Sequence, residues 1–220
     1  MPEVRTRASR SRRLDSVAIR RVRPSDSAGL SAFYASLSPD SSHARFLGHT
    51  RGIGGGLARS FCTLDHMHDE GFVAVTSDER EERIVGHLCL ARVSPVQLEL
   101  GVAVSDEFQG KRIGRRLFSA AIAWAREHRF ASVVATCFAD NSRVLALLTS
   151  APEGAAVTPA DGGVVDVVIP LESPLPRPQV MYPQVRGGRG MRRSAEGKTA
   201  SRPLHVFWRR KPQPERVAGD

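Results

Sequence analysis

A strongly amphipathic segment, residues 115–129, constrains the fold of this chain most. Together with the residues just before it, it forms one apolar face at helical spacing, made by Ile113, Leu117, Ala120, Ala121, Trp124 and His128. The preceding segment VQLELGVAV (96–104) alternates with the period of a strand, and the following ASVVATCF (131–138) is short, apolar and rich in β-branched residues. This order predicts a long helix that packs its apolar face on a sheet.

The remaining segments add strands before this helix and a hairpin after it. Further strands are predicted at 17–22, 71–77, 83–93 and 164–171, a hairpin turn at 161–163, helices at 25–37, 38–48, 57–62 and 141–149, and a loop at 51–56. Because strands cluster before the central helix and helices surround them, the expected class is α/β in the α+β sense. It consists of a mixed, mostly antiparallel central sheet flanked by helices.

The net charge of +9 belongs to the two ends of the chain. Residues 1–16 carry +3 and residues 173–220 carry +8, whereas residues 17–172, with 16 basic and 18 acidic side chains, carry −2. The first segment is rich in Arg and Ser, and the last holds seven of the fourteen prolines. We therefore expect a disordered basic arm at 1–16, one folded domain at 17–172, and a disordered Pro- and Arg-rich tail at 173–220, broken by the apolar LHVFW (204–208).

Composition also narrows the compartment and the chemistry. No stretch approaches the roughly 20 apolar residues that cross a bilayer, and the N-terminal residues lack the apolar segment of a signal peptide. Cys62, Cys89 and Cys137 are far apart and lack metal-ligand spacing, which favours buried thiols in a reducing cytosol. The segment DHMHD (65–69) has metal-ligand residue types but no second cluster, so it indicates a solvated loop. We expect a cytoplasmic protein without a bound metal and without membrane contact.

The segment DEFQGKRIGRRL (106–117) stands out as a candidate anion site. A strand that enters a glycine-containing turn and then a helix points successive backbone N–H groups and the positive end of the helix dipole at one place. Two glycines allow close approach, and Lys111, Arg112, Arg115 and Arg116 add positive charge within an acidic domain. Neither GxxxxGK[ST] nor GxGxxG is present, which argues against those two nucleotide-binding loops. The alternative is a basic turn that merely begins a helix with solvated cations.

At these residues the sequence resembles the GCN5-related N-acetyltransferase (GNAT) superfamily, whose signature is Q/R-x-x-G-x-G/A. In QGKRIG the first glycine position of the signature is filled by Arg112 and the last by Gly114. The resemblance spans about residues 17–172. The stretches IRRVRPSD, LSPDSSHARFLG and ELGVAVSDEFQG look more narrowly like the bacterial protein-lysine acetyltransferase branch.

The resemblance implies a GNAT-like fold that uses acetyl-CoA as co-substrate and no metal. It implies that the backbone of strand 96–104 near Val102 and Val104 binds the pantetheine arm and the acetyl carbonyl, and that Asn141 bonds the cofactor from the following helix. The loop amides that would hold the pyrophosphate belong to Gln109, Gly110, Lys111, Arg112, Ile113, Gly114 and Arg115.

Acetyl transfer to an amine requires a neutral nucleophile, and Glu99 is the candidate general base. An amine with a pKa of about 10.4 needs roughly 4.6 kcal/mol to lose its proton at pH 7. In strand 96–104 the side chain of Glu99 shares a face with Gly101 and Ala103, as expected for a carboxylate at the head of a ligand groove. The resembled branch also carries a glutamate here. The alternative is an ordinary solvated strand residue.

Other roles stay open at the level of sequence. Helix 141–149 lacks the tyrosine that many family members use to protonate the departing thiolate, so Ser142, Thr149 or water are left as candidates. Asp65 or Asp69 can also be interpreted as the border of an acceptor site. The expected reaction is transfer from acetyl-CoA to a primary amine, a protein lysine by branch resemblance or else a small amine, by direct attack in a ternary complex.

A different class of function is compatible with the same residues. The chain can be interpreted as a catalytically weak acyl-CoA-binding module whose basic ends dock on nucleic acid or an acidic protein. Weak nucleic-acid contact is expected only through those ends, where RGGRG (186–190) lies. The expected oligomeric state is a monomer or a homodimer.

Overall fold

The computed structural model describes residues 17–48, 50, 52–77 and 82–171. Its strands are β1 (Ala18–Arg21), β2 (Glu70–Ser77), β3 (Glu82–Ser94), β4 (Gln97–Val104), β5 (Ser132–Phe138), β6 (Ala156–Pro159) and β7 (Val164–Pro170). Its helices are α2 (Ser27–Ala35), α3 (Pro39–Phe46), α4 (Gly55–Cys62), α5 (Ile113–Glu127) and α6 (Ser142–Leu148), with short 3-10 turns at Pro24–Asp26 and Asp106–Phe108. The predicted arm 1–16 and tail 173–220, including LHVFW, lie outside the described residues.

The strands form one seven-stranded sheet in the order β1-β2-β3-β4-β5-β7-β6. Neighbouring strands are antiparallel except β4 and β5, which run parallel because helix α5 connects them across the sheet. The predicted class, a mixed and mostly antiparallel sheet flanked by helices, is confirmed.

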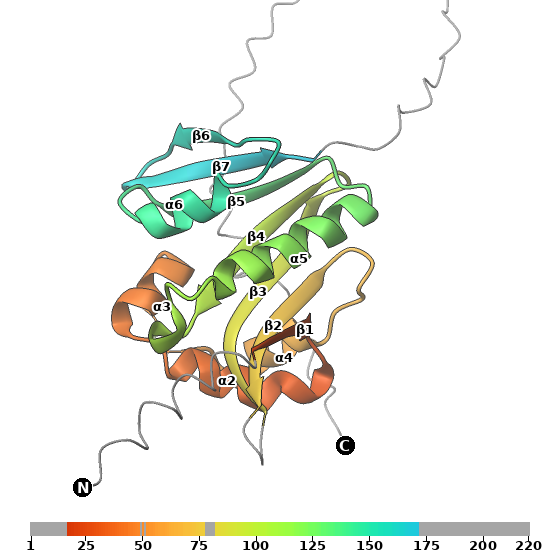
Figure 1. Ribbon diagram of the computed structural model, residues 1–220, viewed down its shortest axis with the longest axis vertical. Helices are drawn as coiled ribbons and strands as arrows, with labels where there is room; N and C mark the ends of the chain where they lie inside the picture. The colour runs from red at the N-terminus through yellow and green to blue at the C-terminus, as the bar shows by residue number, and fades with distance from the viewer. Residues whose placement is uncertain (1–16, 49, 51, 78–81, 172–220) are drawn as a thin grey trace, which may run out of the picture.

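Helices cover both faces of this sheet (Figure 1). On one face α5 packs its apolar side, including Leu117, into a cluster with Leu88 and other sheet residues. On the opposite face α2 and α4 contribute Phe33 and Phe61 to a second cluster that includes Val73 of β2. Alternate residues of each central strand are therefore buried on opposite sides, as the period-2 pattern of β4 predicts.

The sheet opens in its middle, between β4 and β5. These two strands pair only through Gln97–Glu99 and Ser132–Val134, and their register ends there. Helix α3 lies over the opening and contacts both strands. Its His43 ring stacks on Phe138 of β5, with 4.8 Å between the ring centroids. The opening leaves one edge of β4 unpaired at the centre of the domain, where a ligand can reach it.

The structure also bears on two smaller expectations. Within the described residues no helix combines the length and the apolar character needed to cross a membrane. The turn at Asp161–Gly163 connects β6 to β7, and both glycines there have positive φ, as a tight hairpin turn requires.

Candidate active site

A cavity of about 790 Å³ occupies the opening between β4 and β5, below α3 and beside the first turns of α5 and α6. Its wall includes the predicted base and all the residues predicted to bind the cofactor except Lys111, namely Glu99, Val102, Val104, Gln109, Gly110, Arg112, Ile113, Gly114, Arg115 and Asn141. The Lys111 side chain instead places its Nζ 4.9 Å from the centre of the Phe108 ring. The residues predicted from different parts of the chain thus meet in one cavity.

The unpaired edge of β4 presents backbone polar groups to this cavity. The Ser105 N–H donates to the Val85 carbonyl of β3 at 2.9 Å, so the Val104 carbonyl, on the other side of the same trans peptide, points away from β3. That carbonyl accepts from Gln109 Nε2 at 3.2 Å. Because backbone groups alternate along a strand, the N–H groups of Val102 and Val104 also face the cavity. They are donors placed for an extended ligand that carries carbonyl groups.

The turn after β4 directs the N-terminal end of a 15-residue helix, α5, into the same cavity. Arg112 is the N-cap of α5 and its side chain makes no capping hydrogen bond, so the first N–H groups of the helix remain available to a ligand. Arg112 and Arg115 are exposed side chains on the cavity wall. Free amides, the helix dipole and two guanidinium groups together favour an anion.

The irregular glycine spacing of the signature has a structural explanation. Arg112, which fills the first glycine position, has a φ of 62°, and Gly110 has a φ of 73°. The backbone therefore keeps a left-handed conformation at Arg112, although a residue with a Cβ there costs about 1 kcal/mol relative to glycine. This turn leads directly into α5, which begins at Ile113 and not at Arg115 as predicted.

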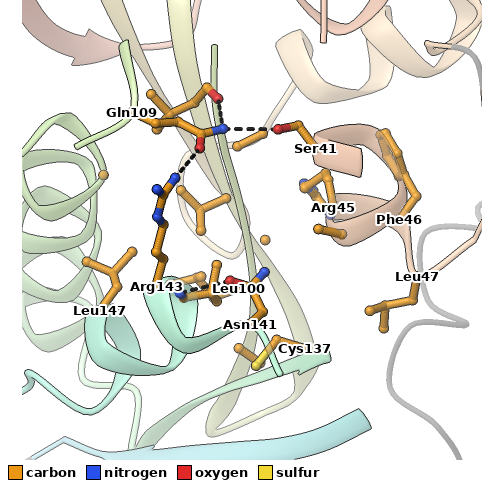
Figure 2. Close-up of a pocket in the computed structure, with 18 of the residues that line it drawn as sticks. Ser41, Arg45, Phe46, Leu47, Leu100, Gln109, Cys137, Asn141, Arg143 and Leu147 are labelled. Carbon is orange, nitrogen blue, oxygen red and sulfur yellow. Dashed lines mark hydrogen bonds between the residues drawn. The ribbon is translucent and has the colours of Figure 1, made fainter. Parts of the chain in front are cut away.

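The side chain of Gln109 links three elements around the cavity (Figure 2). Its Nε2 donates to Ser41 Oγ of α3 at 3.0 Å as well as to the Val104 carbonyl, and its Oε1 accepts from Arg143 of α6 at 3.1 Å. These bonds connect residues that lie 34 and 68 positions from it in the sequence. The side chain of Gln109 thus holds α3, β4 and α6 together at the rim of the site.

Asn141 is the N-cap of α6. Its Oδ1 accepts a hydrogen bond from the Val144 N–H at 3.2 Å, which satisfies one of the unpaired donors at the start of the helix. Its side chain reaches the cavity wall at the same time. Its side-chain nitrogen can donate hydrogen bonds to a ligand, and Oδ1 retains one lone pair that can accept another.

Glu99 is a buried carboxyl group in the cavity wall. It is 6 % exposed, and its Oε2 has no hydrogen-bond partner among the described residues. Burial raises the pKa of Glu99 from its ordinary value of 4.5 to about 7, with the charge of Arg45 opposing this shift and that of Asp166 adding to it. A carboxyl group with this pKa is about half ionised at neutral pH, so it can accept a proton and release it again.

Helix α3 supplies a residue that sequence reasoning did not select, Arg45. Its guanidinium lies flat against Gly101, where an added Cβ would be 2.4 Å from Arg45 Nη2. The space above this small residue, expected to be an empty ligand groove, is therefore partly filled by a cation. In the sequence, Gly101 was the signal for such a contact, because a glycine inside a strand often marks the close approach of another group.

Other predicted contributors lie away from the cavity. Asp65 and Asp69 are absent from its wall. The Asp65 carboxylate accepts backbone N–H groups of its own loop, and Asp69 accepts from the Arg92 N–H at 2.8 Å. Both therefore stabilise the loop before β2. Among the described residues no group of three or more His, Cys, Asp or Glu side chains is arranged to hold a metal.

The two side chains considered for protonating a departing thiolate are also outside the cavity wall. Ser142 is exposed, and the Thr149 hydroxyl donates to the Leu145 carbonyl at 2.8 Å. Of the three candidates named from the sequence, water is the one that the cavity can admit.

Comparison with known proteins gives a consistent result. The family model described as the acetyltransferase (GNAT) family matches residues 44–150. The acetyltransferase PA5475 of Pseudomonas aeruginosa is 29% identical over 126 residues, which are 57% of this chain and 68% of that protein.

Solved structures share the fold at low sequence identity. The GNAT domain of S. lividans PAT matches with a TM-score of 0.63 at 19% identity, covering 70% of this chain and 90% of that one. The Sinorhizobium meliloti phosphinothricin acetyltransferase, solved with AcCoA, gives 0.59 at 18% identity, covering 76% and 96%. The putative acetyltransferase yncA of Salmonella typhimurium, solved with acetyl-CoA, gives 0.57 at 19% identity, covering 71% and 95%. The matched residues 44–150 hold the opened sheet, the β4 edge and the α5 turn, and the match supports an acyltransferase activity of the GNAT type for this chain.

Proposed function

We propose that this protein transfers an acetyl group from acetyl-CoA to a primary amine by direct attack in a ternary complex. The observation that carries the proposal is the position of Glu99: a buried carboxyl group with a pKa of about 7 on the strand whose free edge faces the cavity. The same cavity is lined at its other end by the anion-favouring first turn of α5.

The co-substrate side of the cavity matches acetyl-CoA in its donor set. We assign the pyrophosphate to the amides of residues 110–115 with Arg112 and Arg115, the pantetheine arm to the Val104 N–H and the acetyl carbonyl to the Val102 N–H. Two relatives that share the fold were solved with acetyl-CoA, which supports the assignment. Acetyl-CoA supplies an activated thioester. The Val102 N–H is placed to donate to the thioester oxygen, on which negative charge develops during attack.

Glu99 performs the proton transfer on the acceptor side. A primary amine arrives mostly as an ammonium ion, because its pKa lies about three units above neutral pH. Glu99 in its ionised form takes one proton from that ammonium, and the neutral nitrogen attacks the thioester carbon. As the C–N bond forms and the C–S bond breaks, the second proton of the nitrogen passes through water to the departing thiolate. Glu99 then returns its proton to solvent.

Calorimetric titration with acetyl-CoA, with NADH and ATP as controls, tests the co-substrate. Binding of acetyl-CoA alone is the expected result, and the absence of that binding contradicts the assignment.

Release of the coenzyme A thiol in the presence of amines tests turnover and the role of Glu99. Glu99→Gln should lower kcat at neutral pH by about 10²-fold or more with little change in acetyl-CoA affinity. Glu107→Gln is the matched control, because Glu107 is 56% exposed and pairs with Arg83 outside the cavity wall. Equal turnover by the two variants removes Glu99 from its role as base.

A further inference from the structure

The Arg45 guanidinium is a cation in the cavity that forms no ion pair with a described residue, although it lies close enough to Glu99 for the two charges to interact. Its Nη2 donates to Cys89 Sγ at 3.1 Å, and the Tyr34 hydroxyl lies near it. Part of the side chain faces the cavity, while its Nε is enclosed and has no hydrogen-bond partner among the described residues. In the described part of the chain, no carboxylate oxygen lies within 4.0 Å of a side-chain nitrogen of Arg45, the distance that defines an ion pair.

The groups that hold Arg45 in place are neutral. Tyr34 hydrogen-bonds His87 Nδ1 at 2.8 Å, and burial lowers the pKa of His87 to about 3. His87 is therefore uncharged at neutral pH, and burial raises the pKa of Tyr34 to about 12. The hydrogen-bonded Tyr34 and His87 therefore lie near the guanidinium and add no negative charge.

Enclosing a cation with neutral partners is unfavourable unless an anion arrives to complete the site. The Phe46 ring centre lies 5.1 Å from Arg45 Cζ, and Gly101 covers another side of the guanidinium. The remaining access is through the cavity that Glu99 also lines. A ligand anion that enters this cavity can form the charge-assisted pair that the protein itself lacks.

The spacing between the two charged groups limits the size of that ligand. Arg45 lies over Gly101, and Gly101 and Glu99 are two residues apart on the same face of β4. Same-face neighbours on a strand are about 7 Å apart. A ligand that contacts both groups therefore carries its anion and its amine a short distance apart, as on adjacent carbon atoms, and not at the two ends of a long chain.

We propose that the acceptor is an α-amino carboxylate, with its carboxylate bound by Arg45 and its amine presented to Glu99. This inference rests on the proposed function and specifies its acceptor. It makes Arg45 a specificity-determining residue, because the guanidinium binds a part of the acceptor that takes no part in the reaction. A lysine side chain within a protein has no carboxylate next to its amine and leaves Arg45 unpaired.

The test compares acceptors that differ only in the carboxylate. Release of the coenzyme A thiol from acetyl-CoA is measured with a panel of free α-amino acids, the corresponding α-amino amides, and a peptide with an internal lysine and a blocked N-terminus. We expect the best amino acid to exceed its amide in kcat/KM by about 10²-fold, the usual effect of a charge-assisted pair in an enclosed site. Equal or greater activity with the amides or the peptide overturns the inference and leaves the proposed function intact. No thiol release with any amine contradicts both.

Three variants separate recognition from folding. Arg45→Gln removes the cation, and Gly101→Ala displaces it, because the new Cβ would overlap the guanidinium. Both should bring the acid-to-amide ratio of kcat/KM close to 1. Arg59→Gln is the control, since Arg59 is exposed on α4 and absent from the cavity wall, and it should keep the wild-type ratio. A wild-type ratio in a folded Arg45→Gln variant overturns the inference, and if neither variant folds the wild-type acceptor panel decides it.

Discussion

Replacing Glu99 by Gln should stabilise the fold at alkaline pH while it removes the proposed base. The pKa of Glu99 is raised from 4.5 to about 7 by burial, and its side chain is only 6 % exposed. Ionising it in the folded protein therefore costs the difference between the two values, about 3 kcal/mol. Because the folded pKa is raised, the protein is destabilised by this group as pH rises from 4.5 to 7, and the full cost persists above that window.

Glu99→Gln carries no such cost, so its free energy of unfolding relative to the wild type should depend on pH. Near pH 4 the difference is only a few tenths of a kcal/mol, and at pH 8 the variant should be more stable by about 3 kcal/mol. Urea denaturation at the two pH values measures this difference, and Glu107→Gln is the control. A difference that stays constant between pH 4 and pH 8 refutes the raised pKa and with it the basis for Glu99 as a base at neutral pH.

Four further outcomes follow from single features of the structure. Arg112→Gly should raise the free energy of unfolding by about 1 kcal/mol in urea denaturation, because glycine adopts the left-handed conformation of this position without strain; no gain contradicts the strain. Asn141→Ala should lower the free energy of unfolding by about 1 kcal/mol, because α6 loses its cap. Asn141→Ser retains a capping oxygen and should lower the free energy of unfolding less. Asp166→Asn should move the rise of kcat/KM with pH to lower pH, because the Asp166 charge raises the pKa of Glu99; an unmoved profile argues against that coupling. Finally, we propose 17–172 as the acetyltransferase domain, so a chain cut to these residues should keep acetyl-CoA-dependent thiol release, and its loss places an essential part in the ends.

The local structure could be predicted well because it depends on short-range patterns. The apolar face that includes Leu117 and Trp124 predicts α5, and the alternation of β4 correctly separates Glu99 and Gly101 from their apolar neighbours. The strand–turn–helix order at 106–117 also placed an anion-favouring turn at the cavity. Such features are decided by the periods of strands and helices, which the sequence carries directly.

The roles of polar side chains were less predictable, because they depend on partners far away in the chain. The backbone amide of Gln109 was predicted to lie at the cofactor, but the sequence did not indicate that its side chain bonds Ser41, 68 residues away. Lys111, expected to bind the same anion, turns to the Phe108 ring. Arg45 was not selected at all, because its partner Cys89 lies 44 positions along the chain. Each of these choices is made by packing and not by a local pattern.

By itself, the sequence determined the order of strands and helices, the one-sided character of α5 and the face of β4 that carries Glu99, since these follow from residue periodicity. It also located the excess positive charge in the two ends and the acidic balance in residues 17–172. Only the tertiary structure decided that β4 and β5 separate after Glu99, because the register of two strands is set by everything packed around them. That separation forms the cavity, buries the Glu99 carboxyl group until its pKa reaches about 7, and brings Arg45 to its side.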